Sequence, residues 1–125
     1  MTLQELERTL PNGLHDAELV KLHIDYEGLR VVLELELDVS VNLDEEERYR
    51  RGRITFSGVE FVAIDPPTDV SSMGMSMLAV GMGQPATAPC SLPKLPTECF
   101  LCWLFVDRSN SFIRLAARAV EHEWA

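Results

Sequence analysis

The stretch ELVKLHIDYEGLRVVLELELDV, residues 18–39, decides the fold. Apolar and polar side chains alternate within it in two runs, 18–26 and 29–39. Strict alternation is typical of strands that have one buried and one exposed face. Glu27-Gly28 between the runs is a candidate two-residue turn, in which Gly28 takes a positive φ. The stretch therefore predicts an antiparallel hairpin, with these side chains on its buried face: Val20, Leu22, Ile24, Tyr26, Leu29, Val31, Leu33, Leu35, Leu37 and Val39.

Further elements are expected on both sides of the hairpin. Leu3, Leu6 and Leu10 recur at helical spacing behind Thr2, a candidate N-cap, so we expect a short helix that docks on the sheet. Strands are expected over 54–64, 100–106 and 112–124, which contain β-branched and aromatic residues. A helix over 113–122 is the alternative for the last of them, because that segment contains several alanines. The apolar register of the first of these shifts by one residue, which a β-bulge at Gly58 explains.

Two other segments lack such alternation. Residues 42–53 contain four acidic residues followed by four arginines, and we expect a polar connection whose charges pair locally. Residues 66–97 hold six of the seven prolines, four methionines and almost no charge. We expect a loop there, with a short helix around 70–80, that covers one sheet face or meets a partner through its methionines. The predicted fold is a single α+β domain over residues 1–125: a short N-terminal helix and an antiparallel β-meander of about five strands, with the Pro/Met-rich segment packed on or beside the sheet.

Composition limits the classes of function. The chain carries a net charge of −9, and 13 of its 20 acidic residues fall within residues 1–52. Such a chain repels nucleic acid and anionic lipid and attracts a basic protein, so we expect no nucleic-acid or membrane partner. Three cysteines and the absence of an apolar leader indicate a cytoplasmic protein without disulfides. We expect no cofactor.

Four residues could carry chemistry. His15 and Asp16 precede the first strand, while His23 and Asp25 lie two residues apart, on one strand face. Together they could bind a metal or a small ligand, or act as a hydrolase centre, and this is the alternative function. Structural hydrogen bonding by His15 and Asp16 is the competing interpretation. Cys99 and Cys102 fall on opposite faces of a strand, so they cannot coordinate the same metal ion there.

The run LPNGLHDAEL, residues 10–19, with two alternating strands after it, resembles a group of small uncharacterised bacterial proteins. These have a His-Asp-small-x-aliphatic motif before a β-meander, and some belong to the immunity-type proteins of bacterial toxin systems. The turn at 107–112 and the terminal Trp124 are similar as well. The resemblance implies a non-enzymatic single domain and assigns no catalytic residue.

The leading hypothesis is therefore a cytoplasmic protein-interaction domain, and its specific form is an immunity-like inhibitor of a basic toxin. Glu34, Glu36 and Asp38 would be aligned on the exposed face of the hairpin and would steer the basic partner, while apolar anchors within 73–82 would add affinity. A third hypothesis is self-association, a homo-oligomer formed through an unprotected edge strand.

Overall fold

The computed structural model describes residues 1–14, 16–40, 48–64, 76–83, 98–106 and 111–125. Within these ranges the chain is mostly β and contains one helix and eight strands. The elements are α1 (Leu3–Thr9), β1 (Glu18–Asp25), β2 (Arg30–Asp38), β3 (Tyr49–Ser57), β4 (Phe61–Ile64), β5 (Ser76–Gly83), β6 (Phe100–Val106), β7 (Ser111–Ala117) and β8 (Ala119–Trp124). The described helix is too short to cross a membrane.

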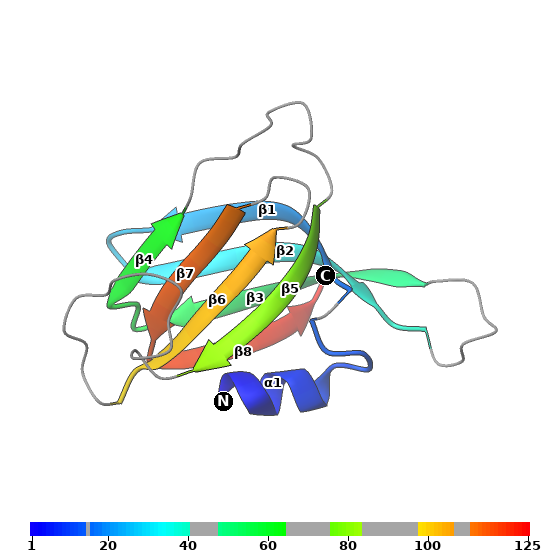
Figure 1. Ribbon diagram of the computed structural model, residues 1–125, viewed down its shortest axis with the longest axis horizontal. Helices are drawn as coiled ribbons and strands as arrows, with labels where there is room; N and C mark the ends of the chain where they lie inside the picture. Colours follow the sequence, from blue (N-terminus) through cyan, green and yellow to red (C-terminus); the bar gives the residue numbers. More distant parts are fainter. Residues whose placement is uncertain (15, 41–47, 65–75, 84–97, 107–110) are drawn as a thin grey trace.

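The strands follow the order β4-β7-β6-β5-β1-β2-β3-β8, and every pairing is antiparallel. They form two sheets, and in Figure 1 β5, β6 and β7 cross in front of β1, β2 and β3. The sheets are joined between β1 and β5 by only two residue pairs, Glu18–Met77 and Leu19–Ser76. The prediction of an α+β fold with a five-stranded meander is therefore wrong, because two antiparallel sheets dominate the described chain.

Three misread segments account for the difference in strand number. The predicted strand over 54–64 is two strands, β3 and β4, and β3 begins at Tyr49, among arginines where a polar connection was expected. Part of the Pro/Met-rich segment forms β5, between β6 and β1 in the sheet order, rather than a helix on or beside the sheet. The remainder of that segment lies outside the described residues. The last predicted strand is two strands, β7 and β8, which belong to different sheets.

The bulge predicted at Gly58 is confirmed. Gly58 has φ +60, and the pairing register moves by one residue between Ser57–Ala119 and Phe61–Ala116. At this extra residue the chain passes from β3 in one sheet to β4 in the other. The partner strands do the same at Arg118, where the chain passes from β7 to β8. Gly58 is therefore the corner at which two paired strands pass together between the sheets.

The core lies between the sheets, and α1 closes part of it. The inward side chains of β2 are all at most 1% exposed, and they meet Ile54 and Phe56 of β3. Leu3, Leu6 and Leu10 are buried in the same cluster, which confirms that the helix docks on the sheets. Thr2 caps the helix as predicted: its Oγ1 accepts a hydrogen bond from the Glu5 N–H, and Glu5 bonds back to the Thr2 N–H.

The hairpin of β1 and β2 is confirmed, but its ends differ from the prediction. A register irregularity between Leu19 and Lys21 leaves Val20 38% exposed. The turn takes four residues, 26–29, instead of two. Its positive φ, +52°, belongs to Leu29 and not to Gly28. Tyr26 and Leu29, both predicted to be buried, are 81% and 55% exposed.

Candidate functional site

The outer face of β1, β2, β3 and β8 carries charges of alternating sign. One row crosses all four strands and consists of Lys21, Glu34, Arg53 and Glu123. Arg53 holds the row together, because its guanidinium lies 3.6 Å from the Glu34 carboxylate and 3.0 Å from that of Glu123. Opposite charges directly across a sheet favour the pairing of these strands.

A shallow hollow of about 440 Å³ lies over this face. Its walls are the four residues of the charged row, and its remaining lining residues are His23, Asp25, Arg30, Val32 and Thr55. The hollow is wide and polar, unlike the apolar, enclosed pockets that hold most small molecules. Its side chains suit another protein's surface better than a buried ligand.

The three acidic residues expected to steer a basic partner do not form a free acidic stripe. Glu34 pairs with Arg53, and Glu36 pairs with Arg51 at 2.6 Å. Asp38 accepts hydrogen bonds from the backbone N–H and the hydroxyl of Ser40. Of the four arginines expected to pair locally with residues 44–47, Arg51 and Arg53 thus pair with acidic residues of β2.

The three candidate residues that the structure describes, Asp16, His23 and Asp25, lie at two ends of β1. His23 and Asp25 share the outer face of β1, as their spacing predicted, and the structure shows that they line the hollow. Asp16 is half-buried in the turn before β1, and His15 lies outside the described residues. Five residues of strand separate Glu18 from His23, a distance of about 16 Å. Asp16 therefore cannot share one metal ion with His23, and the described residues contain no cluster of three His, Cys, Asp or Glu side chains that could hold a metal.

The cysteines have a structural environment. Cys102 is completely buried, and desolvation raises the pKa of its thiol to about 12. Cys99 is half-buried, and burial raises the pKa of its thiol as well. A thiol held in its protonated form is a poor nucleophile. Cys102 is therefore part of the core, as predicted.

At one end of the hollow, Asp25 and Arg30 organise the turn between β1 and β2. The Asp25 carboxylate accepts the Gly28 N–H at 2.9 Å and pairs with the Arg30 guanidinium at 2.9 Å. These two contacts, the Gly28 hydrogen bond first, lower the pKa of Asp25 below its ordinary value. The carboxylate is thus kept charged, and it fixes the shape of a turn that is otherwise exposed.

Leu29 occupies an unusual conformation in this turn. Its φ of +52° lies in the left-handed region, which a bulky non-glycine residue rarely adopts. The Val59 N–H donates a hydrogen bond of 3.0 Å to the Leu29 carbonyl and so ties the turn to the corner between β3 and β4. An exposed apolar side chain held by strained backbone is a candidate for function, since such strain concentrates at binding sites.

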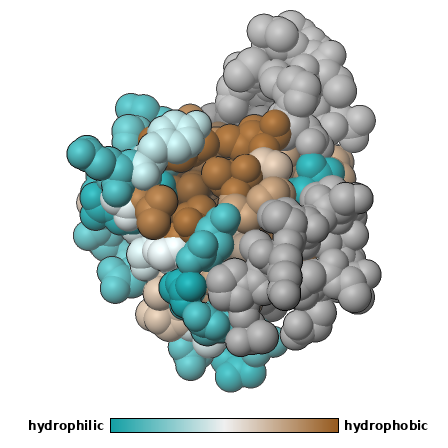
Figure 2. Space-filling model, turned by 90° about the vertical axis from the view of Figure 1, so that its left-hand side faces the viewer, coloured by the Kyte–Doolittle hydropathy of each residue, from teal (hydrophilic) through white to brown (hydrophobic). Residues whose placement is uncertain are grey.

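We call the apolar surface at this end of the molecule the hairpin-end surface. It surrounds a groove of about 170 Å³ between the turn and β4. Figure 2 shows the apolar area on the end that faces left in Figure 1, beside hydrophilic residues. Its apolar members are Ile24, Tyr26, Leu29, Val59, Phe61, Val62 and the 43%-exposed Ile64, and the buried Val31 lies beneath the groove. Asp25 and Arg30 line both this groove and the charged hollow, so the two surfaces are continuous.

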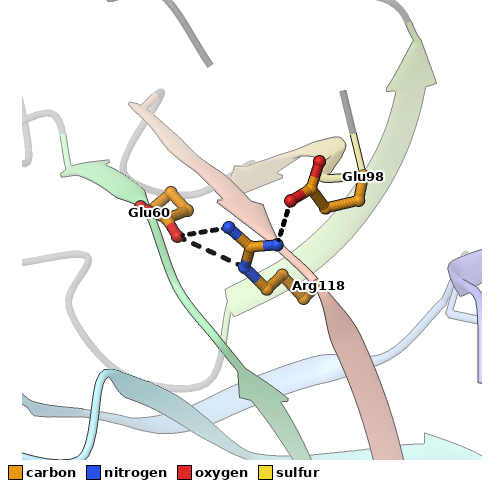
Figure 3. Close-up of polar contacts among 3 residues, drawn as sticks. All are labelled: Glu60, Glu98 and Arg118. Carbon is orange, nitrogen blue, oxygen red and sulfur yellow. Dashed lines mark hydrogen bonds and ion pairs between the residues drawn. The ribbon is translucent and has the colours of Figure 1, made fainter. Parts of the chain in front are cut away.

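A three-residue ionic cluster borders the hairpin-end surface. Arg118 pairs with Glu60 at 2.9 Å and with Glu98 at 2.6 Å (Figure 3). The hydrogen bonds to Glu98 and Glu60 raise the pKa of the Arg118 guanidinium, which is charged in any case. The cluster joins the corner of β7 and β8 to the chain just before β4 and just before β6.

The sequence did not indicate the hairpin-end surface, because alternation assigned Tyr26 and Leu29 to the buried face. The available signal was their position next to a glycine turn, where no facing element needs to cover them.

No protein-family model matches the chain, and no curated protein sequence is significantly similar to it. One solved structure with a related shape is the crystal structure of an uncharacterized protein from Neisseria gonorrhoeae. It is 16% identical, with a TM-score of 0.49, over 87% of this chain and 91% of the other.

Proposed function

We propose that this chain is a non-enzymatic protein-interaction domain whose partner docks on the hairpin-end surface. The observation that carries the proposal is the pair of large apolar side chains, Tyr26 and Leu29, 81% and 55% exposed at the tip of one ordered turn. Contiguous exposed apolar surface with a polar border is typical of protein-binding sites.

Tyr26 and Leu29 suit the role of anchors. Tyrosine is enriched among the residues that dominate binding energy, and a groove beside an anchor gives the partner a place to pack. The turn that carries them is fixed by Asp25, Arg30 and the Val59–Leu29 hydrogen bond. A preorganised turn loses little conformational entropy when it binds, which strengthens the complex.

The charged hollow would contribute specificity. Its charges already pair with one another, so a partner gains little net attraction by replacing them. A matching partner would place a charge of opposite sign over each residue of the row Lys21, Glu34, Arg53 and Glu123. A partner with a different order of charges would bring like charges together. We therefore assign orientation to the hollow and affinity to the hairpin-end surface.

The charge of the chain favours a basic partner. The net charge is −9, and Glu27 and Glu60 border the hairpin-end surface. A cationic protein would be drawn toward such a chain and would associate faster at low salt. An immunity-like inhibitor of a basic toxin, acting in the cytoplasm, is the specific role that we propose. The steering charge then belongs to the whole chain and not to Glu34, Glu36 and Asp38.

The experiment starts with capture from an extract of the cells that make the protein. A captured protein is purified, and its affinity is measured by calorimetry for the wild type, for the double variant Tyr26→Ser/Leu29→Ser and for Val20→Ser. Val20 is a matched control, since it is 38% exposed on β1 but lines neither the groove nor the hollow. We expect the double variant to bind at least about 100-fold more weakly, and Val20→Ser to bind like the wild type. Equal affinity of the double variant and the wild type would refute the proposal.

A further inference from the structure

β4 and β8 stand at the two ends of the strand order, and their outer edges differ. The edge of β8 is occupied by the N-terminal residue: the Met1 amino group donates to the Val120 carbonyl at 3.3 Å, and the Val120 N–H donates to the Met1 carbonyl at 3.2 Å. Within the described residues, no strand pairs with the second edge of β4. As far as the described residues show, β4 thus has one row of backbone donors and acceptors that an additional strand could pair with.

The sequence of β4 also lacks charged residues and proline, which are two of the usual protections of an edge strand. It reads Phe-Val-Ala-Ile, residues 61–64, without a charge or a proline. Exposed edges in natural proteins commonly carry charged residues, as β8 does at Glu121 and Glu123. An uncharged, β-favouring edge is suited to pairing with another extended segment.

The groove of the hairpin-end surface lies beside this edge. Phe61 and Val62 of β4 line one side of it, and Ile24 and Leu29 line the other. An apolar cavity of about 150 Å³ holds a benzene molecule, so the groove volume of about 170 Å³ suits one large apolar side chain. An added strand would place alternate side chains over this groove, since successive residues of a strand point to opposite faces.

The charges around the groove indicate what should flank that side chain. Glu60 lines the groove, Glu27 lies at the tip of the turn, and Asp25 is adjacent. Arg30 and Arg118 pair with Asp25 and Glu60, but Glu98 also shares Arg118. Carboxylates therefore outnumber guanidinium groups at this border, which favours lysine or arginine in the occupant and disfavours a second copy of this acidic chain.

We propose that the basic partner binds by adding an extended segment to the edge of β4 that no described strand pairs with. One large apolar residue of that segment fills the groove, and its lysine or arginine neighbours contact the acidic border. The inference rests on the proposed function and specifies the mode of binding. Backbone hydrogen bonds to β4 supply affinity in this mode, and the groove and its border supply specificity.

The test uses a synthetic peptide in which valine alternates with lysine, and a control peptide in which glutamate replaces every lysine. The isotope-labelled full chain is titrated with each peptide, and backbone amide exchange is followed by NMR. We expect the lysine peptide to bind and to slow the exchange of amides within Phe61–Ile64, and the glutamate peptide to bind at least about tenfold more weakly. Ile64→Lys, a charge on the exposed end of the edge, should weaken lysine-peptide binding about tenfold or more, whereas Val20→Lys should not.

Three results would overturn the inference. The first is that the lysine peptide does not bind, and the second is that it binds but leaves the amides of β4 unprotected. The third is that the chain alone forms a dimer, which Ile64→Lys abolishes. The third result would assign the edge to a second copy. A separate outcome is that the natural partner binds Tyr26→Ser/Leu29→Ser more weakly and yet leaves the β4 amides of the wild-type chain unprotected. In that case the proposed function stands and strand addition does not.

Discussion

The side chain of Arg118 lies directly against the backbone of Gly58. A Cβ atom at position 58 would come within 2.9 Å of the Arg118 Cδ and 3.0 Å of its Cβ. The Arg118 N–H also donates a hydrogen bond of 3.1 Å to the Ser57 carbonyl. The two chain segments that pass between the sheets are therefore in contact at their corner, where Arg118 reaches Glu60 and Glu98.

Gly58→Ala should destabilise the chain more than Gly13→Ala. Both glycines have positive φ, +60° and +62°, so both alanines carry a backbone cost of about 1–2 kcal/mol. At Gly13 the nearest atom to a new Cβ is 3.9 Å away, whereas at Gly58 the new Cβ must displace Arg118. We expect an additional loss of about 1 kcal/mol for Gly58→Ala in urea unfolding. Equal losses for the two variants would show that the contact with Arg118 is easily rearranged.

The pKa of His122 predicts a loss of stability at mildly acidic pH. Burial, and after it the nearby Arg50 charge, lowers the pKa from 6.5, although Glu123 acts in the opposite direction. The His122 Nε2 atom is buried and has no hydrogen-bond partner among the described residues, and the ring packs edge-on against Trp124. Below pH 6.5 the unfolded chain binds a proton at this residue more readily than the folded chain, so the free energy of unfolding falls as the pH falls.

Unfolding should therefore be measured across the range below pH 6.5 for the wild type and for His122→Gln. The variant cannot take up this proton, and we expect its stability to decline less over that range. Parallel curves for the two proteins would contradict the assignment of the effect to His122.

Asp25 should remain acidic even when Arg30 is removed. Its pKa is below 3.8 first because of the Gly28 N–H and then because of Arg30. In an NMR titration, Arg30→Gln should raise the pKa of Asp25 only part of the way to 3.8. A complete return to 3.8 would mean that Arg30, and not the turn backbone, keeps the carboxylate charged.

The hairpin, the helix and the Gly58 bulge were predictable because each depends on local pattern. Alternation specified β2 residue by residue, and one misplaced apolar residue indicated the bulge. β5 was not predictable, because a short apolar run between prolines and glycines does not separate strand from helix, and its state is set by pairing with β6. The start of β3 was missed because arginines favour a strand here only through the facing acids of β2.

The candidate site was less predictable than the fold. The shared face of His23 and Asp25 followed from their spacing of two. The pairing of Glu34 and Glu36 with arginines required the register of β3, which the sequence alone did not specify. The exposure of Tyr26 and Leu29 depends on which element faces them, and a pattern within one strand carries no information about that.

Leu29→Asn should stabilise the folded chain. Asparagine tolerates the left-handed region better than leucine, and Leu29 is more than half exposed, so little packing is lost. We expect a gain of about 0.5–1 kcal/mol in urea unfolding. Leu29→Ala, which keeps most of the backbone cost, is the control and should show no gain. A lower stability for Leu29→Asn than for Leu29→Ala would mean that the turn is not strained.

The most direct test of the account is the affinity of the purified partner for Leu29→Asn. We predict that the partner binds Leu29→Asn at least about tenfold more weakly than the wild type, although the variant is as stable as the wild type or more so. Lost affinity without lost stability would place Leu29 in the interface, as an anchor kept in spite of its backbone conformation. Unchanged affinity would contradict the central claim that the hairpin-end surface is where the partner binds.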